Sequence, residues 1–335
     1  MANAAVGKSW AGHATGILTG LAAGGTFLLG ALDLAGAPVL APSSLSDQAR
    51  LGVDVGTMLT GFAGAALTAL PVRKWIARFL PIDPESPVHA VAMTLAVILF
   101  GTQVSSIAFT DVLAANATQP PLTVADLVLN EVPFLVLALA GVGLFSRRRA
   151  PDAARRLGWV RPAWWHVVLA LACAGAFFAF GQEMGVLGHA LTPSVSSRVD
   201  ATTQHVFGGL GTPAGVLVLA LAPGICEETL FRGALQPRIG LLAAALLFTS
   251  IHTEYGLSFD TLSVFVIAIG LGVLRRTTNT TTSSVCHVTY NLLAGISVTG
   301  TLLLAGGAVE LVLAGVAAYA IWTVRRRRQT VDPAP

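Results

Sequence analysis

Charged side chains are scarce in this sequence. Of its 335 residues, only 11% are Asp, Glu, Lys or Arg, whereas 54% are hydrophobic. An ordinary soluble domain carries about 25% charged residues, so this composition excludes a soluble globular protein. The apolar residues also form continuous runs instead of the alternating pattern that a membrane β-barrel requires. The predicted fold class is therefore all-α, a polytopic integral membrane helical bundle.

Cysteine and metal-binding motifs are equally sparse. Cys173, Cys226 and Cys286 form no CxxC pair, and an odd number of cysteines argues against a disulfide framework. The chain contains no His-Glu-x-x-His motif of the kind that binds zinc in metallopeptidases. We therefore expect no cofactor and no resident metal.

Apolar runs repeatedly reach the roughly 20 residues that cross the hydrocarbon core of a membrane as a helix. The predicted spans are 15–41, 51–70, 88–109, 121–145, 163–188, 207–231, 239–255, 258–274, 284–304 and 307–324. Clusters of Lys and Arg follow the even-numbered spans, and only Arg50 and Arg198 lie in the other loops. By the positive-inside rule, we expect about ten transmembrane helices in the cell membrane, with both termini cytoplasmic.

The same basic clusters bear on partners and domain boundaries. Because membrane topology explains their positions, the lipid bilayer is the expected partner and nucleic acid is not. The most polar segment separates four spans from six. We therefore predict a four-span N-terminal extension (1–146), a cytoplasmic Arg-rich linker (147–162), a functional core (163–305), and a final span with a basic tail (306–335).

Ionisable residues inside membrane spans are costly and often functional. Several occur singly, and each alone is more often an interfacial or interhelical hydrogen-bonding group than a catalyst. These single residues are Asp33, Asp54, Asp126, Glu131, His166, Glu183 and Glu310.

A denser group begins at the end of the sixth span. Glu227 and Glu228 are adjacent, and Arg232 follows four residues after Glu228. On a helix, Glu228 and Arg232 share one face and can form an ion pair. Glu227 is turned by about 100° from Glu228, so we expect it to point elsewhere.

The following helices contribute two histidines. His252 lies in the seventh predicted span, and His287 lies in the ninth with Asn291 four residues later on the same face. Counted from the nearest cytoplasmic Arg residues, Glu227, His252 and His287 lie at comparable depth. Any one of them alone is best explained by packing, but together they indicate a site.

Three blocks carry a resemblance to a known family. They are Glu-Glu-x-x-x-Arg at 227–232, Phe-x-x-x-His at 248–252 and His-x-x-x-Asn at 287–291. In order and approximate spacing they resemble the signature of the CPBP family, which includes the type II CAAX prenyl endopeptidases and proteins of bacteriocin processing and abortive infection. The resemblance covers roughly 160–305.

This resemblance implies an intramembrane endopeptidase with a cavity open to the cytoplasmic side. It implies that Glu227 activates a water molecule with help from His252, and that Glu228 and Arg232 hold the helix and tune the local charge. His287 and Asn291 would donate hydrogen bonds to the oxyanion. The expected substrate is a peptide or membrane protein, with or without a lipid group.

Three other functions remain open. Glu227, His252 and His287 could instead form the ligand set of a zinc-dependent peptidase, although the neighbouring Arg opposes a cation. The same polar cluster could serve a transporter or a non-enzymatic membrane scaffold. No inverted repeat relates residues 1–150 to residues 163–324, which disfavours a transporter.

Overall fold

The computed structural model describes residues 2–37, 45–296 and 300–331, and every regular element in these ranges is a helix. The elements in chain order are α1 (Ala2–Ala5), α2 (Ala11–Leu34), α3 (Asp47–Ala66), α4 (Leu70–Ile76), α5 (Pro87–Phe109), α6 (Val112–Ala117), α7 (Val124–Val142), α8 (Ala150–Leu157), α9 (Trp164–Leu191), α10 (Pro193–Phe207), η1 (Gly208–Leu210), α11 (Pro213–Glu227), η2 (Glu228–Leu235), α12 (Gln236–Ile239), α13 (Leu241–Ser250), η3 (Thr253–Tyr255), α14 (Phe259–Thr277), α15 (Thr280–Gly295) and α16 (Gly300–Val331). The predicted all-α class is confirmed.

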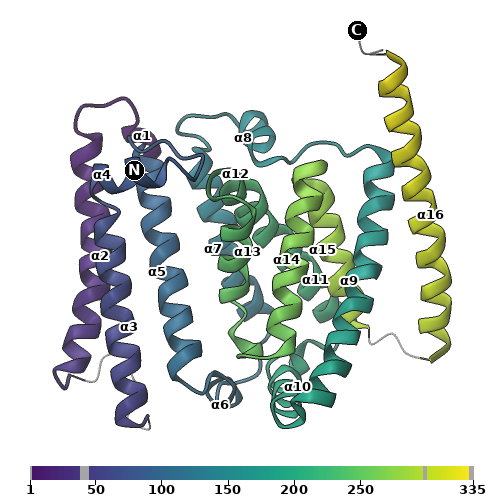
Figure 1. The fold of residues 1–335 in the computed structure, drawn as a ribbon, viewed down its shortest axis with the longest axis horizontal. Helices are drawn as coiled ribbons and strands as arrows, with labels where there is room; N and C mark the ends of the chain where they lie inside the picture. Colours follow the sequence, from purple (N-terminus) through teal and green to yellow (C-terminus); the bar gives the residue numbers. More distant parts are fainter. Residues whose placement is uncertain (1, 38–44, 297–299, 332–335) are drawn as a thin grey trace.

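The long helices run alternately between two ends of the bundle (Figure 1). The short helices α1, α4, α8 and α12 lie at one end, together with the C-terminal ends of α14 and α16. The helices α6 and α10 lie at the other end. Since α4, α8, α12 and the last turn of α14 carry basic residues, the positive charge gathers mainly at one end.

Each predicted span overlaps a helix, but not every one of these helices is long and apolar enough to cross a membrane. Within the described ranges six helices are long and apolar enough, or up to seven if α3 and α4, bent by 92°, count as one span. The helix α13 has only 10 residues, about 15 Å, and α15 has 16. The ends of spans 15–41 and 284–304 include residues 38–41 and 297–299, which lie outside the described residues. These helices make the chain a multi-pass membrane protein, and the count of ten stays a prediction.

Packing around η2 forms the largest apolar core. Phe231 is fully buried and packs edge to face against Phe134 of α7 and Phe248 of α13, with ring centroids 5.9 and 5.2 Å apart. Leu157 of α8 and Ala268 of α14 belong to the same core. The candidate residues around 227–232 are therefore held by α7, α8, α13 and α14 together.

A polar contact joins α6 to α10 at the end opposite α4, α8 and α12. Arg198 donates a hydrogen bond to Asp111 Oδ2 over 2.6 Å, and Asp111 Oδ1 accepts one from the Ala114 amide at the start of α6. The Ala114 amide and the Arg198 guanidinium lower the pKa of Asp111. The carboxylate form of Asp111 therefore stabilises this contact.

Replacing Asp111 by Asn tests this contribution, because Asn keeps the helix cap but removes the charge. A lowered folded pKa means that the charge stabilises the fold above the ordinary value of about 3.9 and that this stabilisation is lost as the pH falls through the folded value. We expect Asp111→Asn to lower Tm slightly at pH 7, with the difference from wild type narrowing between about pH 5 and pH 2. Thermal unfolding in detergent measures it, and a difference independent of pH would contradict this account.

Candidate active site

Glu227 and Glu228 lie where one type of helix changes into another. The helix α11 begins with Thr212 as its N-cap, which accepts a hydrogen bond from the Gly215 amide, and it ends at Glu227. The chain then continues from Glu228 as the π-helix η2. Such π-turns are rare and occur frequently at functional sites. The sequence pattern predicted a plain α-helix through this segment.

Glu228 and Arg232 form a buried ion pair, as their spacing predicted. Arg232 Nη1 lies 3.0 Å from Glu228 Oε1, and both side chains are almost completely buried. Arg232 also donates a hydrogen bond to the Ala268 carbonyl of α14, and its guanidinium lies 4.1 Å from the centre of the Phe248 ring in α13. One cation thus links η2 to two neighbouring helices.

His287 of α15 lies between the two glutamates. Its Nδ1 is 3.2 Å from Glu228 Oε1, and its Nε2 is 4.0 Å from Glu227 Oε2. A carboxylate only accepts hydrogen bonds, so Nδ1 is the nitrogen that donates to Glu228. Although Glu227 is turned by about 100° from Glu228 along the helix, one imidazole ring approaches both side chains: Nδ1 lies next to Glu228 and Nε2 lies next to Glu227.

A glycine permits the close approach of α11 and α15. A Cβ atom on Gly224 would lie 2.5 Å from Val288 Cγ2 and 3.0 Å from the Val288 backbone nitrogen. Ser284 donates a hydrogen bond to the Gly224 carbonyl. Because Val288 is next to His287, this contact sets the distance between His287 and Glu227.

His252 follows the end of α13 and lies beside the same aromatic core. Its Nδ1 is 2.9 Å from the Phe248 carbonyl, and its ring stacks on Tyr255 with centroids 6.3 Å apart. The Phe248 ring centre lies 4.7 Å from that of His252 and 6.0 Å from that of His287. Phe248 therefore lies next to both histidines.

Asn291 has a structural partner in addition to its predicted role. Its Nδ2 lies 3.4 Å from the Leu219 carbonyl of α11. Pro223 stands four residues after Leu219 and has no amide hydrogen, so the helix cannot satisfy this carbonyl itself. The Asn291 amide group supplies the missing donor. The sequence contained this signal in Pro223, but only the packing of α15 on α11 reveals it.

The six predicted residues thus divide into one cluster and two neighbours. Glu227, Glu228, Arg232 and His287 are buried and are linked by successive contacts of 4.0 Å or less. His252 adjoins this cluster through Phe248, and Asn291 lies one turn beyond His287 on α15. Among the described residues, no group of three His, Cys, Asp or Glu side chains is arranged to hold a metal ion.

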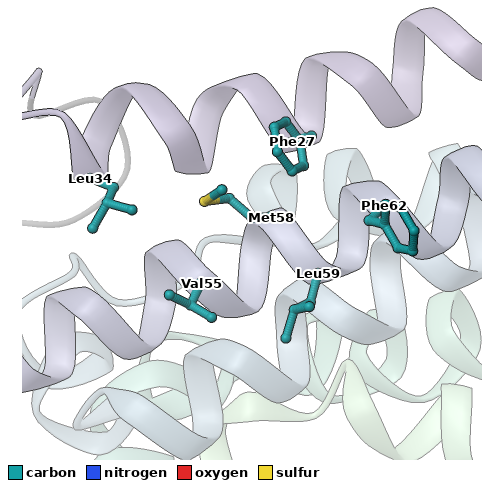
Figure 2. Close-up of a pocket in the computed structure, with 6 residues that line it drawn as sticks. All are labelled: Phe27, Leu34, Val55, Met58, Leu59 and Phe62. Carbon is teal, nitrogen blue, oxygen red and sulfur yellow. The ribbon is translucent and has the colours of Figure 1, made fainter.

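Two apolar pockets lie away from this cluster. One, of about 390 Å³, lies between α2 and α3, and Figure 2 shows its lining of Phe27, Leu34, Val55, Met58, Leu59 and Phe62. It has no ionisable side chain and therefore no means of activating water. The other, of about 630 Å³, lies among α5, α10, α13 and α14 and includes Ser250, two residues before His252. Neither pocket is lined by Glu227, His252 or His287.

Part of the chain matches the model of a known protein family. Residues 209–293 match a family model described as type II CAAX prenyl endopeptidase Rce1-like. No curated protein and no solved structure matches the chain. The matched segment is about a quarter of the chain and contains all three sequence blocks, including Glu227, His252 and His287. Over this segment the chain is similar to the CAAX endopeptidases, a family of membrane peptidases, and the resemblance predicted from the three blocks is confirmed.

Proposed function

We propose that this protein is an intramembrane endopeptidase in which Glu227 acts as the general base. One observation carries the proposal: Glu227 is only 4% exposed, and its Oε2 lies 4.0 Å from His287 Nε2, while Arg232 pairs with Glu228 instead. A buried carboxylate without its own cation can accept a proton. The match to a peptidase family supports this chemistry.

The distance between Glu227 and His287 is suited to a bridging water molecule. At 4.0 Å the two atoms are too far apart for a direct hydrogen bond, yet one water can reach both. Glu227 takes a proton from this water as the water oxygen attacks the scissile carbonyl carbon, and the carbonyl electron pair moves onto its oxygen. The C–N bond then breaks, and Glu227 returns the proton to the leaving nitrogen.

In this mechanism, His287 and Asn291 stabilise the oxyanion. His287 Nδ1 donates to Glu228, so donation from Nε2 requires a second proton on the ring. The Glu228 carboxylate beside Nδ1 favours that charged form, whereas the burial of the ring opposes it. Asn291 donates through Nδ2 after exchanging the Leu219 carbonyl for the oxyanion. His252, whose ring adjoins Phe248 as the ring of His287 does, would help to orient the water.

Replacing Asn291 by Ala is expected to lower kcat by about 10²-fold with little change in KM, since an oxyanion donor acts in the transition state. The loss of the hydrogen bond to the Leu219 carbonyl should also cost about 1 kcal/mol of stability. Cleavage kinetics and thermal unfolding on the same preparation separate the two effects. A stability loss with unchanged kcat would leave Asn291 only its structural role.

The proposed topology places ten spans in the cell membrane with both termini in the cytoplasm. The arrangement in Figure 1 supports it, since the basic helices α4, α8 and α12 lie at the end where α14 and α16 finish. We propose that the cluster is reached through a cavity that opens toward the cytoplasm, near the end of η2. We propose a peptide or membrane-protein substrate there, with or without a lipid group.

Substrate trapping tests the proposed function directly. The Glu227→Gln variant, expressed in native membranes, should retain uncleaved peptides that the wild type releases. Purified wild type in liposomes should then cleave those peptides, and a chelator should leave the rate unchanged. Dependence on added zinc would support the zinc-peptidase alternative, and transport without cleavage would support the transporter.

A further inference from the structure

Glu131 is a buried carboxyl group outside the segment that matches the peptidase family. It lies on α7, is 7% exposed, and its Oε2 has no hydrogen-bond partner in the described part of the chain. The sequence alone does not distinguish Glu131 from the other single acidic residues in the predicted spans. An unpartnered buried carboxyl is costly, so its surroundings decide its role.

The packing of α7 places Glu131 beside Glu227. The helices α7 and α11 are in contact and run in the same direction in Figure 1. Phe134 of α7 packs against Phe231 of η2. Glu131 lies one turn before Phe134, and Glu227 lies one turn before Phe231, so parallel helices bring the two acids to the same level.

Electrostatics agree with this register. Glu131 exerts the strongest influence of any charged group on Glu227, and it also acts on the adjacent Cys226. Glu227 Oε2 likewise has no direct hydrogen-bond partner among the described residues. Two buried carboxylates with this influence on each other cannot both carry a full charge at low cost, so one of them retains a proton.

Other charged groups surround this pair of carboxyl groups. Arg232 attracts the charge of Glu227 while Glu228 and Glu254 repel it, and burial opposes the charge of both Glu131 and Glu227. The charged or titratable groups on elements packed against α7 are Cys226, Glu227, Glu228 and Arg232 on α11 and η2, and Asp152, Arg155 and Arg156 on α8. His287 and Glu254 add their influence on the Glu227 side.

We infer that Glu131 and Glu227 form a carboxyl pair that holds one proton, for which the two groups compete, so that Glu227 becomes the ionised base only at the expense of Glu131. This inference rests on the proposed function. It makes Glu131 a positioning residue that acts through Glu227: its negative charge, when it forms, raises the cost of ionising Glu227. The four-span N-terminal extension thereby contributes to the site.

The pH dependence of cleavage tests the pair. Glutamine at position 131 remains neutral at every pH and still donates a hydrogen bond, so Glu227 ionises without competition for the proton. We expect Glu131→Gln to move the acid limb of kcat/KM to lower pH by at least half a unit, since the coupling within such a pair exceeds about one pH unit. The Glu183→Gln variant makes the same change on an exposed face of α9 and should leave the profile in place.

Infrared spectroscopy gives a second measurement that needs no activity. The carbonyl band of a protonated carboxyl group should lose intensity near neutral pH in Glu131→Gln but not in Glu183→Gln. If Glu131→Gln fails to fold, Glu227→Gln serves instead: without the repelling charge, the Glu131 band should disappear at lower pH than in wild type.

The outcomes separate this inference from the proposed function. An unmoved acid limb together with an unchanged carbonyl band in Glu131→Gln would overturn the carboxyl pair, even if Glu227→Gln abolishes cleavage. If wild type and Glu227→Gln cleave equally, the proposed function fails, and the infrared bands alone then decide whether the pair exists.

Discussion

Cleavage by the Glu227→Gln variant is expected to fall by about 10³-fold or more relative to wild type. General-base catalysis contributes about 10²–10⁴-fold, and glutamine cannot take a proton from water. No described acid can replace it without cost: Glu228 pairs with Arg232 and accepts from His287, and Glu131 lies on a different helix. The loss should appear in kcat and equally in kcat/KM, because the proton transfer occurs only in the transition state.

The measurement requires a folded variant and a matched control. Glutamine differs from glutamate by one group of equal size, so the variant should elute at the same size as wild type and unfold at a similar temperature. The Glu183→Gln change removes a carboxylate from an exposed position of another span and should retain wild-type cleavage. Equal rates for Glu227→Gln and wild type would remove Glu227 from the mechanism.

The sequence predicts most of the fold because membrane helices follow from composition and length alone. Each apolar run corresponds to a helix, and the spacing of Glu228 and Arg232 predicts their ion pair. Length and apolarity alone do not determine the number of spans. The helix α13 is short, and it packs against α5, α14 and η2 instead of facing lipid along a full span. Its burial within the bundle depends on contacts between distant segments.

Several details of the site could not be predicted from the sequence, because they depend on how distant segments pack together. Local propensities do not predict the π-helix η2. Within it, Phe231 packs against α7 and Arg232 donates a hydrogen bond to α14, and these contacts join segments that are distant in the sequence. The partner of Asn291 depends on which carbonyl of α11 faces α15. Glu131 lies almost a hundred residues before Glu227, and only the pairing of α7 with α11 distinguishes it from other single acids in the spans.

Replacing Arg232 by Met should cost about 3–5 kcal/mol of unfolding free energy, the usual result of removing one partner from a buried ion pair. Arg232 is 2% exposed and Glu228 is completely buried, so the variant leaves a carboxylate without its cation. The hydrogen bond to the Ala268 carbonyl and the contact with the Phe248 ring are lost as well. Denaturant unfolding in mixed detergent micelles measures the change.

A second substitution distinguishes the charge from the packing. When Arg232→Met is combined with Glu228→Gln, no buried charge of the pair is left uncompensated, and the amide oxygen introduced at position 228 can still accept a hydrogen bond from His287 Nδ1. Because replacing both partners of a buried pair is often nearly neutral, the double variant should recover most of the stability lost by Arg232→Met. If the double variant is as unstable as Arg232→Met, Arg232 stabilises the fold through its contacts with α13 and α14, and its charge contributes little.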